Sequence, residues 1–245
     1  MVRKKDVFMK KFYILVLLFV IMISTAVQAE TSFDEQINLI ASNADLWKQD
    51  VEYGVWGYVI TDLDHNGQLE ILSCSVQGTG FYSYIKAYEV NKDGTELNDL
   101  MKELTYRTDS SPDIMVSSVP VYFDKESNRY YYIFDDMIRS GMAEYYENKR
   151  AVSVVDDLWK EIMLADKATI YTDADHAKVT CSDGNGNEIS EARYAEIADI
   201  VFSNLESGEA CFNWTTTDND EFSSLTVPQL IENLKSAAQD QCRTY

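Results

Sequence analysis

The stretch from Tyr58 to Leu72, YVITDLDHNGQLEIL, constrains this chain more than any other. Two apolar, β-prone runs flank a short polar turn, and the turn contains acidic residues, an asparagine and a single glycine. Gly67 stands where the backbone must bend sharply, because glycine adopts conformations that other residues avoid. Two strands joined by a tight acidic loop are therefore expected here.

The polar residues of this turn have the spacing of a calcium-binding loop. Asp62, Asp64 and Asn66 occupy alternate positions, so that three side chains can point toward one centre. Calcium takes roughly six to eight oxygen ligands in a flexible shell. The backbone carbonyl of Gln68 and the carboxylate of Glu70, directly or through water, can supply two more. These five residues are the predicted metal ligands.

The pattern D-x-[DN]-x-[DN]-G also matches the first half of an EF-hand loop. At the twelfth place, however, Ser73 replaces the bidentate glutamate, and the flanks favour strands over helices. We therefore expect a strand-flanked loop that binds calcium weakly, on the order of 10⁻⁴ to 10⁻³ M. The alternative is a plain hairpin, because Asn66-Gly67 is by itself a strong turn signal. Calcium is preferred because a turn alone has no need of three carboxylates at these offsets.

The same residues carry a resemblance to known proteins. The pattern strand, D-x-D-x-[DN]-G-x-x-[DE], strand resembles the calcium loop of FG-GAP/VCBS-type β modules. It is also similar to the DxDGDGxxEL loop of poorly characterised secreted proteins and lipoproteins of Gram-positive bacteria. The resemblance implies an extracellular bacterial module in which Asp62, Asp64, Asn66 and Glu70 occupy the ligand positions. His65 and Asn66 replace the more usual glycine and aspartate, which lowers the expected affinity. The match implies no enzymatic activity.

The N-terminus has the features of a secretory signal. Basic residues precede an apolar run from Phe12 to Ile23, and small residues lead to Ala29. The run is shorter than the roughly 20 residues that cross a membrane, which favours a cleaved signal over an uncleaved anchor. Residues 1–29 are thus predicted to be a signal peptide, and residues 30–245 a single secreted domain without membrane attachment after cleavage.

The chain is strongly acidic, with a formal net charge of −20. Such a charge repels phosphate backbones and anionic lipids, which argues against nucleic acids and membrane surfaces as partners. It attracts cations, calcium among them. For most of the acids, keeping a secreted protein soluble is a sufficient explanation.

Four cysteines permit up to two disulfides in an exported chain, in any of three pairings, among Cys74, Cys181, Cys211 and Cys242. Cys74 lies inside an apolar strand run, where a buried free thiol is an equally good interpretation. Any bridge is expected first among the other three cysteines, which fall in the C-terminal third.

Three helices are predicted. A capping box formed by Ser32 and Glu35 opens a helix over about 33–49, whose apolar residues recur at helical spacing. Toward the C-terminus, Ser190 caps a second helix that ends before Gly208, and Thr226 opens a third.

Alternating apolar and polar residues predict strands between the first helix and the other two. The strand-like runs are 51–60, 69–76, 81–90, 129–138, 143–149 and 152–164, and a small hairpin of 177–182 and 188–189 leads into the second helix. The expected fold is therefore α+β, with the N-terminal helix packed on an antiparallel meander sheet and two C-terminal helices.

No motif for catalysis is present in the sequence. Neither His65 nor His176 belongs to an H-E-x-x-H motif, and no G-x-S-x-G elbow or Cys-x-x-Cys occurs. No catalytic residue is predicted, and a non-enzymatic role is favoured. We expect a secreted acidic module with a structural calcium ion that binds an extracellular or cell-surface protein or glycan. The alternative is an extracellular hydrolase of polysaccharide or cell wall, whose paired carboxylates would lie among the 41 acidic residues.

Overall fold

A computed structural model describes residues 31–52, 54–104, 111–173, 176–238 and 243–244. The chain divides into two compact units, Met1–Thr31 and Ser32–Tyr245, and the elements below belong to the second. The predicted signal peptide lies outside the described residues. Within the described ranges, no helix has the length and apolar character needed to cross a membrane.

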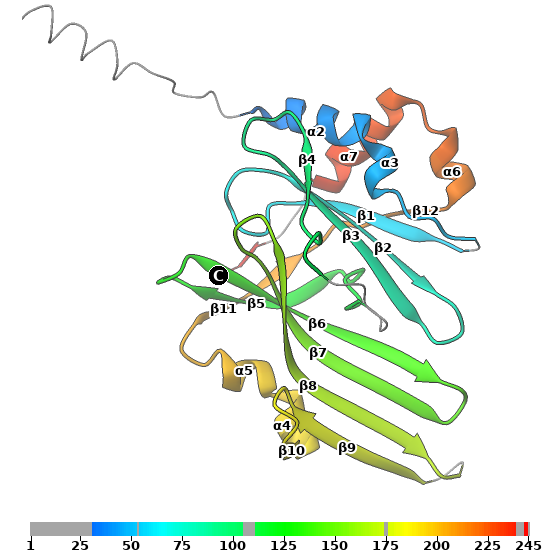
Figure 1. The fold of residues 1–245 in the computed structure, drawn as a ribbon, viewed down its shortest axis with the longest axis vertical. Helices are drawn as coiled ribbons and strands as arrows, with labels where there is room; N and C mark the ends of the chain where they lie inside the picture. Colours follow the sequence, from blue (N-terminus) through cyan, green and yellow to red (C-terminus); the bar gives the residue numbers. More distant parts are fainter. Residues whose placement is uncertain (1–30, 53, 105–110, 174–175, 239–242, 245) are drawn as a thin grey trace, which may run out of the picture. The chain divides into compact units, whose positions relative to one another are not determined.

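The first antiparallel sheet carries the predicted calcium loop (Figure 1). In spatial order its strands are β12 (Thr215–Thr217), β1 (Trp56–Thr61), β2 (Glu70–Gln77), β3 (Tyr82–Val90) and β4 (Leu97–Asp99). The loop connects β1 to β2, whose pairing ends with Thr61 opposite Glu70. Every residue of β1 is buried, so this sheet is covered on both faces.

The second antiparallel sheet contains the tyrosine-rich middle of the chain. In spatial order its strands are β10 (Glu188–Ile189), β9 (Ala177–Asp183), β8 (Trp159–Tyr171), β7 (Glu144–Val154), β6 (Arg129–Ser140), β5 (Ser118–Asp124), β11 (Glu206–Cys211) and β13 (Arg243–Thr244). Strands β6, β7 and β8 are long, with 12, 11 and 13 residues. Strand β6 extends the predicted run 129–138. The predicted strand 152–164 is wrong, because the turn between β7 and β8 falls within it, and the break predicted between 143–149 and 152–164 lies inside β7.

The helices are short. They are α2 (Phe33–Ser42), α3 (Ala44–Trp47), α4 (Glu191–Ala195), α5 (Ile197–Val201), α6 (Asn219–Ser224) and α7 (Val227–Ala238). The capping box at Ser32 opens α2, but the predicted helix over 33–49 is interrupted at Asn43. The helix predicted from Ser190 is likewise divided into α4 and α5.

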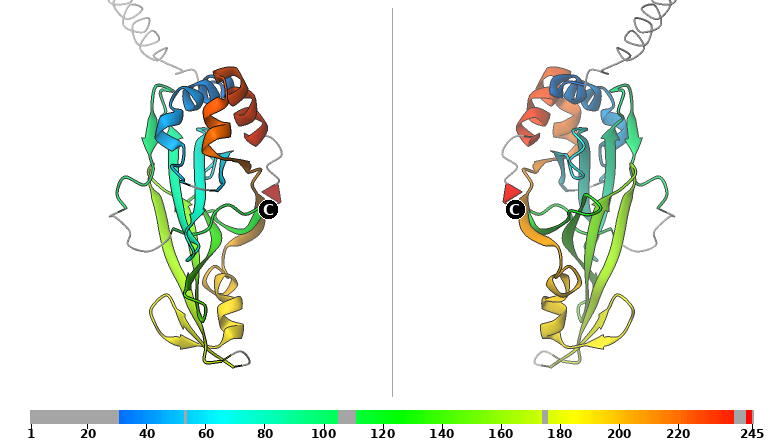
Figure 2. Two further views of the ribbon diagram at one scale, coloured as in Figure 1. Left: turned by 90° about the vertical axis from the view of Figure 1, so that its right-hand side faces the viewer. Right: turned by 90° about the vertical axis from the view of Figure 1, so that its left-hand side faces the viewer.

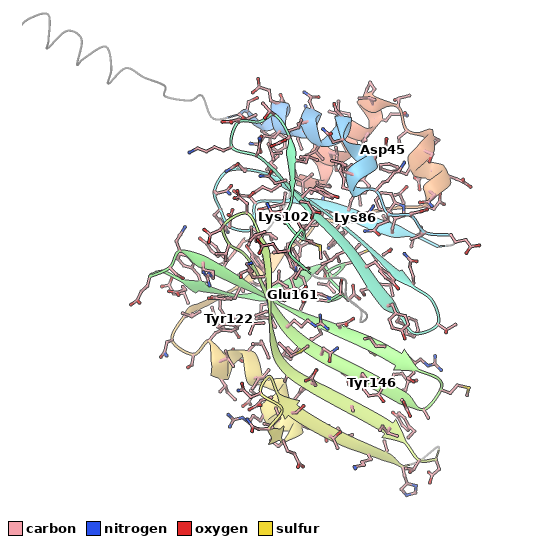
Figure 3. The ribbon with its side chains drawn as sticks, viewed as in Figure 1. Asp45, Lys86, Lys102, Tyr122, Tyr146 and Glu161 are labelled. Atoms are coloured by element: carbon pink, nitrogen blue, oxygen red, sulfur yellow. The ribbon has the colours of Figure 1, made fainter. Side chains whose placement is uncertain are left out.

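Each sheet has helices on one face. Figures 1 and 2 show α2, α3, α6 and α7 gathered against the first sheet, where Ile37, Trp47 and Leu234 pack with Trp56 and Tyr58. Helices α4 and α5 cover one face of the second sheet. There Tyr122, labelled in Figure 3, donates a hydrogen bond from its hydroxyl to Oδ1 of Asp199 at 2.6 Å.

The other faces of the two sheets share a hydrophobic core. It combines residues of the first sheet with residues of the second, among them Val59, Leu72, Cys74, Ala87, Val121, Tyr132, Val152, Val154 and Trp159. This shared core brings the loop between β1 and β2, residues 62–69 and called the acidic loop below, close to turns of the second sheet.

The predicted α+β fold, with an N-terminal helix on one meander sheet and two C-terminal helices, is wrong. The protein is mostly β, with two large antiparallel sheets and short helices. Alternation shows which face of a strand is buried, but it does not show which strands share a sheet. Helix α6 also lies where no helix was predicted. Strands β4, β5, β11 and β12 arise where none was predicted.

Two cysteines are buried free thiols, Cys74 in β2 and Cys181 in β9. Cys211 takes part in a disulfide. Cys242 lies outside the described residues. Burial raises the pKa of the Cys74 thiol to about 12, so this thiol is unreactive at neutral pH.

Candidate metal centre

The connection between β1 and β2 folds as a tight polar loop. Gly67 and His65 both have left-handed backbone conformations, with φ of 85° and 60°. The Asn66 N–H donates to Oδ1 of Asp64 at 3.2 Å, and the Gln68 N–H donates to Oδ1 of Asn66 at 2.7 Å. Aspartate and asparagine stabilise turns in this way, by accepting hydrogen bonds from the backbone two residues later.

Three of the predicted ligands come together. Asp62, Asp64 and Glu70 each offer one carboxylate oxygen, and these oxygens lie within 4.8 Å of one another. Oxygens that bind calcium lie roughly 2.3–2.6 Å from the ion, so two on opposite sides are about 5 Å apart. The spacing of the three carboxylates therefore suits a single cation.

The other two predicted ligands have different contacts. Asn66 turns its carbonyl oxygen to the Gln68 N–H, and its Nδ2 donates to Oδ2 of Asp64 at 3.1 Å and to Oε1 of Glu89 at 2.9 Å. In this arrangement Asn66 orients the carboxylates of Asp64 and Glu89. The carbonyl of Gln68 stays a predicted ligand.

Glu70 is the most constrained member of the cluster. It begins β2 and is completely buried, with 0% of its surface exposed. Its Oε2 accepts hydrogen bonds from Thr61 Oγ1 and from the Leu63 N–H, both at 2.8 Å. Its Oε1 is buried and has no hydrogen-bond partner. A buried polar atom without a partner costs about 1–3 kcal/mol, and more when it is charged.

Sequence reasoning missed Glu89. The register of β2 and β3 places it directly opposite Glu70, and it is also completely buried. Its Oε2 has no hydrogen-bond partner. Like charges directly opposite each other destabilise a sheet. Glu89 thus adds a buried carboxylate next to the cluster from a neighbouring strand, although the group of oxygens within 4.8 Å of one another does not include it.

Burial and mutual repulsion dominate the electrostatics of this cluster. Burial raises the pKa of Glu70 well above its usual range, and the charge of Glu89 raises it further. Burial raises the pKa of Glu89 to about 7, against the hydrogen bond from Asn66. No lysine or arginine in the described ranges pairs with either glutamate. The two carboxyls therefore need protons or an added cation.

Residues outside the loop hold it in place. Gln36 in α2 is buried, donates from Nε2 to the Gly67 carbonyl at 3.1 Å, and accepts at Oε1 from the Leu69 N–H at 2.7 Å. From the second sheet, the Tyr132 hydroxyl donates to the Leu63 carbonyl at 2.8 Å. The His65 ring stacks on Tyr130 with a centroid distance of 4.0 Å. The loop is therefore fixed by one helix and by both sheets.

Comparison with protein-family models, with curated proteins and with solved structures found no match to this chain. The likeness to FG-GAP/VCBS-type loops accordingly stays a prediction based on the loop residues.

Proposed function

We propose that this chain binds a calcium ion through Asp62, Asp64, Glu70 and Glu89, and that the ion stabilises the fold of a secreted binding protein. The observation that carries the proposal is the buried Oε1 of Glu70, which has no hydrogen-bond partner and belongs to a group of converging carboxylates. A divalent cation would offset both the desolvation of this oxygen and the repulsion between the two buried glutamates.

The ligand types favour calcium over other metals. The metal-binding group found among the described residues contains carboxylates only, whereas zinc sites use histidine and cysteine. Magnesium keeps several water molecules and is usually bound by one or two carboxylates. A site with several converging carboxylates, two of them completely buried, is better suited to the larger and more flexible shell of calcium.

The burial of the site favours a structural role for the ion. Glu70 and Glu89 lie at the inner face of the first sheet, out of reach of a polymeric substrate. This placement argues against their use as the catalytic pair of a hydrolase. A structural calcium ion also agrees with export, because a weak calcium site is filled where calcium is plentiful.

Titration calorimetry and thermal unfolding of residues 30–245 test the metal site. We expect heat of binding at millimolar calcium and a higher Tm, both abolished by Glu70→Gln, which keeps the shape of the side chain. The matched control is Asp183→Asn, in a turn that has the same alternation of Asp and Asn but whose carboxylate is exposed. Absence of calcium heat in the unaltered protein would refute the proposal.

A groove on the second sheet supports the binding of an extracellular glycan. It has a volume of about 600 Å³ and lies over β7, β8 and β9. Asn148, Asp166 and Ser182 are cross-strand neighbours in β7, β8 and β9. The exposed Tyr146, labelled in Figure 3, lines the same groove. Amide, carboxylate and hydroxyl groups next to an aromatic ring suit the hydroxyls and apolar faces of sugars.

A glycan array probed with the secreted domain in millimolar calcium tests this second part. We expect binding to at least one class of oligosaccharide, lost in Asp166→Asn. The same array should be unaffected by Asp220→Asn, which removes one exposed carboxylate from α6. An array without hits, or equal losses in both variants, would contradict a glycan-binding groove.

A further inference from the structure

The groove over β7, β8 and β9 lies on the face of the second sheet that is turned away from α4 and α5. On the face covered by these helices, Nζ of Lys167 lies 5.9 Å from the centroid of the Tyr194 ring, and Cys181 belongs to the core beneath the helices. Successive side chains of a strand point to opposite faces. Asp166 and Ser182, which precede and follow these two strand residues, therefore project into the groove that they line.

The polar side chains of this groove are not used to hold the fold together. Within the described ranges, the side chains of Asn148, Asp166 and Ser182 make no hydrogen bond and no ion pair. Lys167, which follows Asp166 in the sequence, pairs with Glu147 at 2.8 Å on the other face. These three side chains are therefore available to a ligand.

Asp166 has the strongest need of a partner among them. It is partly buried, and burial raises the pKa of its carboxyl. A charge that loses water without gaining a counter-ion is unfavourable. A cationic group bound in the groove would replace the water that Asp166 has lost, whereas a neutral group would do so less well.

The other charges of the groove leave the surroundings of Asp166 negative. Lys178 is exposed and lies four residues before Ser182 in β9, which is about 13 Å along the strand. Glu188 is opposite Ser182 in β10 and is exposed, so water screens its charge. The net charge of −20 has the same sign. This end of the groove therefore attracts cations.

We propose that the groove selects oligosaccharides with free amino groups, and that the Asp166 carboxylate accepts hydrogen bonds from a protonated amine of the sugar. The inference rests on the proposed glycan groove and names the class of sugar that it binds. Asn148 and Ser182, the cross-strand neighbours of Asp166, can bind sugar hydroxyls. The exposed Tyr146 ring, two residues from Asn148 on the same face, suits both a pyranose and a cation (Figure 3).

A sugar amine fits this groove better than a metal ion does. The group of converging carboxylates found in the described part of the chain lies in the acidic loop of the first sheet and does not include Asp166. A single partly buried carboxylate between an amide and a hydroxyl gives a metal too few charged ligands. The same three groups suit a ligand that presents one amine among several hydroxyls.

Titration calorimetry with two matched series of sugars tests the inference. Glucosamine oligomers are compared with N-acetylglucosamine oligomers of the same length, because acetylation removes the charge and keeps the pyranose chain. We expect the unaltered protein to bind the free amines about tenfold more tightly, since hydrogen bonds between charged groups are stronger than neutral ones. In Asp166→Asn, which keeps the shape of the side chain, both series should bind weakly and within about threefold of each other.

The matched control is Asp220→Asn, which removes the same charge from α6 and should keep the tenfold preference. A preference that survives in Asp166→Asn, or that falls equally in both variants, would overturn the inference. Spermine, a polyamine without sugar rings, should displace a bound glucosamine oligomer only at a concentration at least about tenfold higher. Displacement at equal concentration would mean general attraction of cations and would also overturn it.

The failure of this inference differs from the failure of the proposed groove. If both series bind equally well and Asp166→Asn abolishes the binding of both, the preference for amines is wrong and the glycan groove stands. If the unaltered protein binds no oligosaccharide of either series and none on the array, the groove itself is refuted.

Discussion

Two turns of this protein have nearly the same sequence pattern and opposite electrostatics. In the turn between β9 and β10, Oδ1 of Asp183 accepts hydrogen bonds from the N–H groups of Asn185 and Asn187 at 3.0 and 2.9 Å. The hydrogen bond from the Asn187 side chain, followed by these backbone contacts, lowers the pKa of Asp183. In the loop between β1 and β2, burial raises the pKa of Asp64 and of Glu70.

The difference lies in the strand that each turn leads into. After the β9–β10 turn the chain continues along an exposed surface, and Glu188 is solvated. After the acidic loop the chain enters the core, so that Glu70 is buried and faces Glu89. Alternating Asp and Asn are therefore compatible with an ordinary turn. A carboxylate buried in the strand beyond the turn is what distinguishes a candidate cation site.

Removing the carboxylate of Glu89 should have the largest effect on the contrast between the β1–β2 loop and the β9–β10 turn. We expect Glu89→Gln to weaken calcium binding about 100-fold, since it removes a charged and completely buried ligand. Without calcium the same variant should be more stable than the unaltered protein, because the repulsion between the two glutamates is gone. Calorimetry and urea unfolding, each with and without chelator, measure both effects.

The critical result is that Glu89→Gln should weaken calcium binding and yet stabilise the calcium-free protein. A variant that is destabilised with and without calcium would indicate that Glu89 serves packing alone. Glu188→Gln, an exposed glutamate beside the other turn, is the matched control and should change neither quantity.

The pH dependence of stability should sharpen the comparison. Glu89 has a pKa of about 7 in the folded protein, above the ordinary glutamate value of 4.5. A carboxyl with a raised pKa binds more protons in the folded state, so its stabilising contribution is complete below the ordinary value and is lost as pH rises through about 7. In chelator, we expect the free energy of unfolding to fall by on the order of 1–2 kcal/mol between pH 4.5 and 7.5, after allowance for solvent screening.

Calcium should remove this loss, because the ion stabilises the deprotonated carboxylates. Urea unfolding at several pH values measures the effect, and Glu89→Gln should flatten the profile in chelator. The lowered pKa of Asp183 has the opposite effect on the pH dependence of stability. Its stabilising contribution is present at neutral pH and is lost as pH falls through the lowered pKa of the folded protein. A stability in chelator that rises steadily from pH 5 to 7.5 would contradict the protonated state inferred for the buried pair.

Local signals in the sequence were sufficient for part of the site. The offsets of Asp62, Asp64 and Glu70 predicted a cluster, and the structure brings these three together. The capping box at Ser32 and the strands that flank the loop were also found. Each of these depends on residues close in sequence, where spacing alone determines geometry.

The remainder depends on contacts between distant residues. Glu89 is set opposite Glu70 by the register of two strands, and Gln36 reaches the loop from a helix. One signal for Glu89 was available, because alternation along β3 places it on the same face as the buried Ile85 and Ala87. The division of the strands into two sheets had no local signal, so the fold class was predicted wrongly.

Two glycines offer the smallest and most closely matched test. Gly67 and Gly186 have φ of 85° and 81°, and a Cβ added to either meets no atom within 4 Å. Substitution by alanine therefore introduces backbone strain without a steric clash, at about 1 kcal/mol for each. We expect Gly67→Ala and Gly186→Ala to lower the Tm equally in chelator. Only Gly67→Ala should weaken calcium binding, because only the strain at Gly67 displaces carboxylates that bind the ion. Equal calcium affinities in the two variants would place the cation elsewhere.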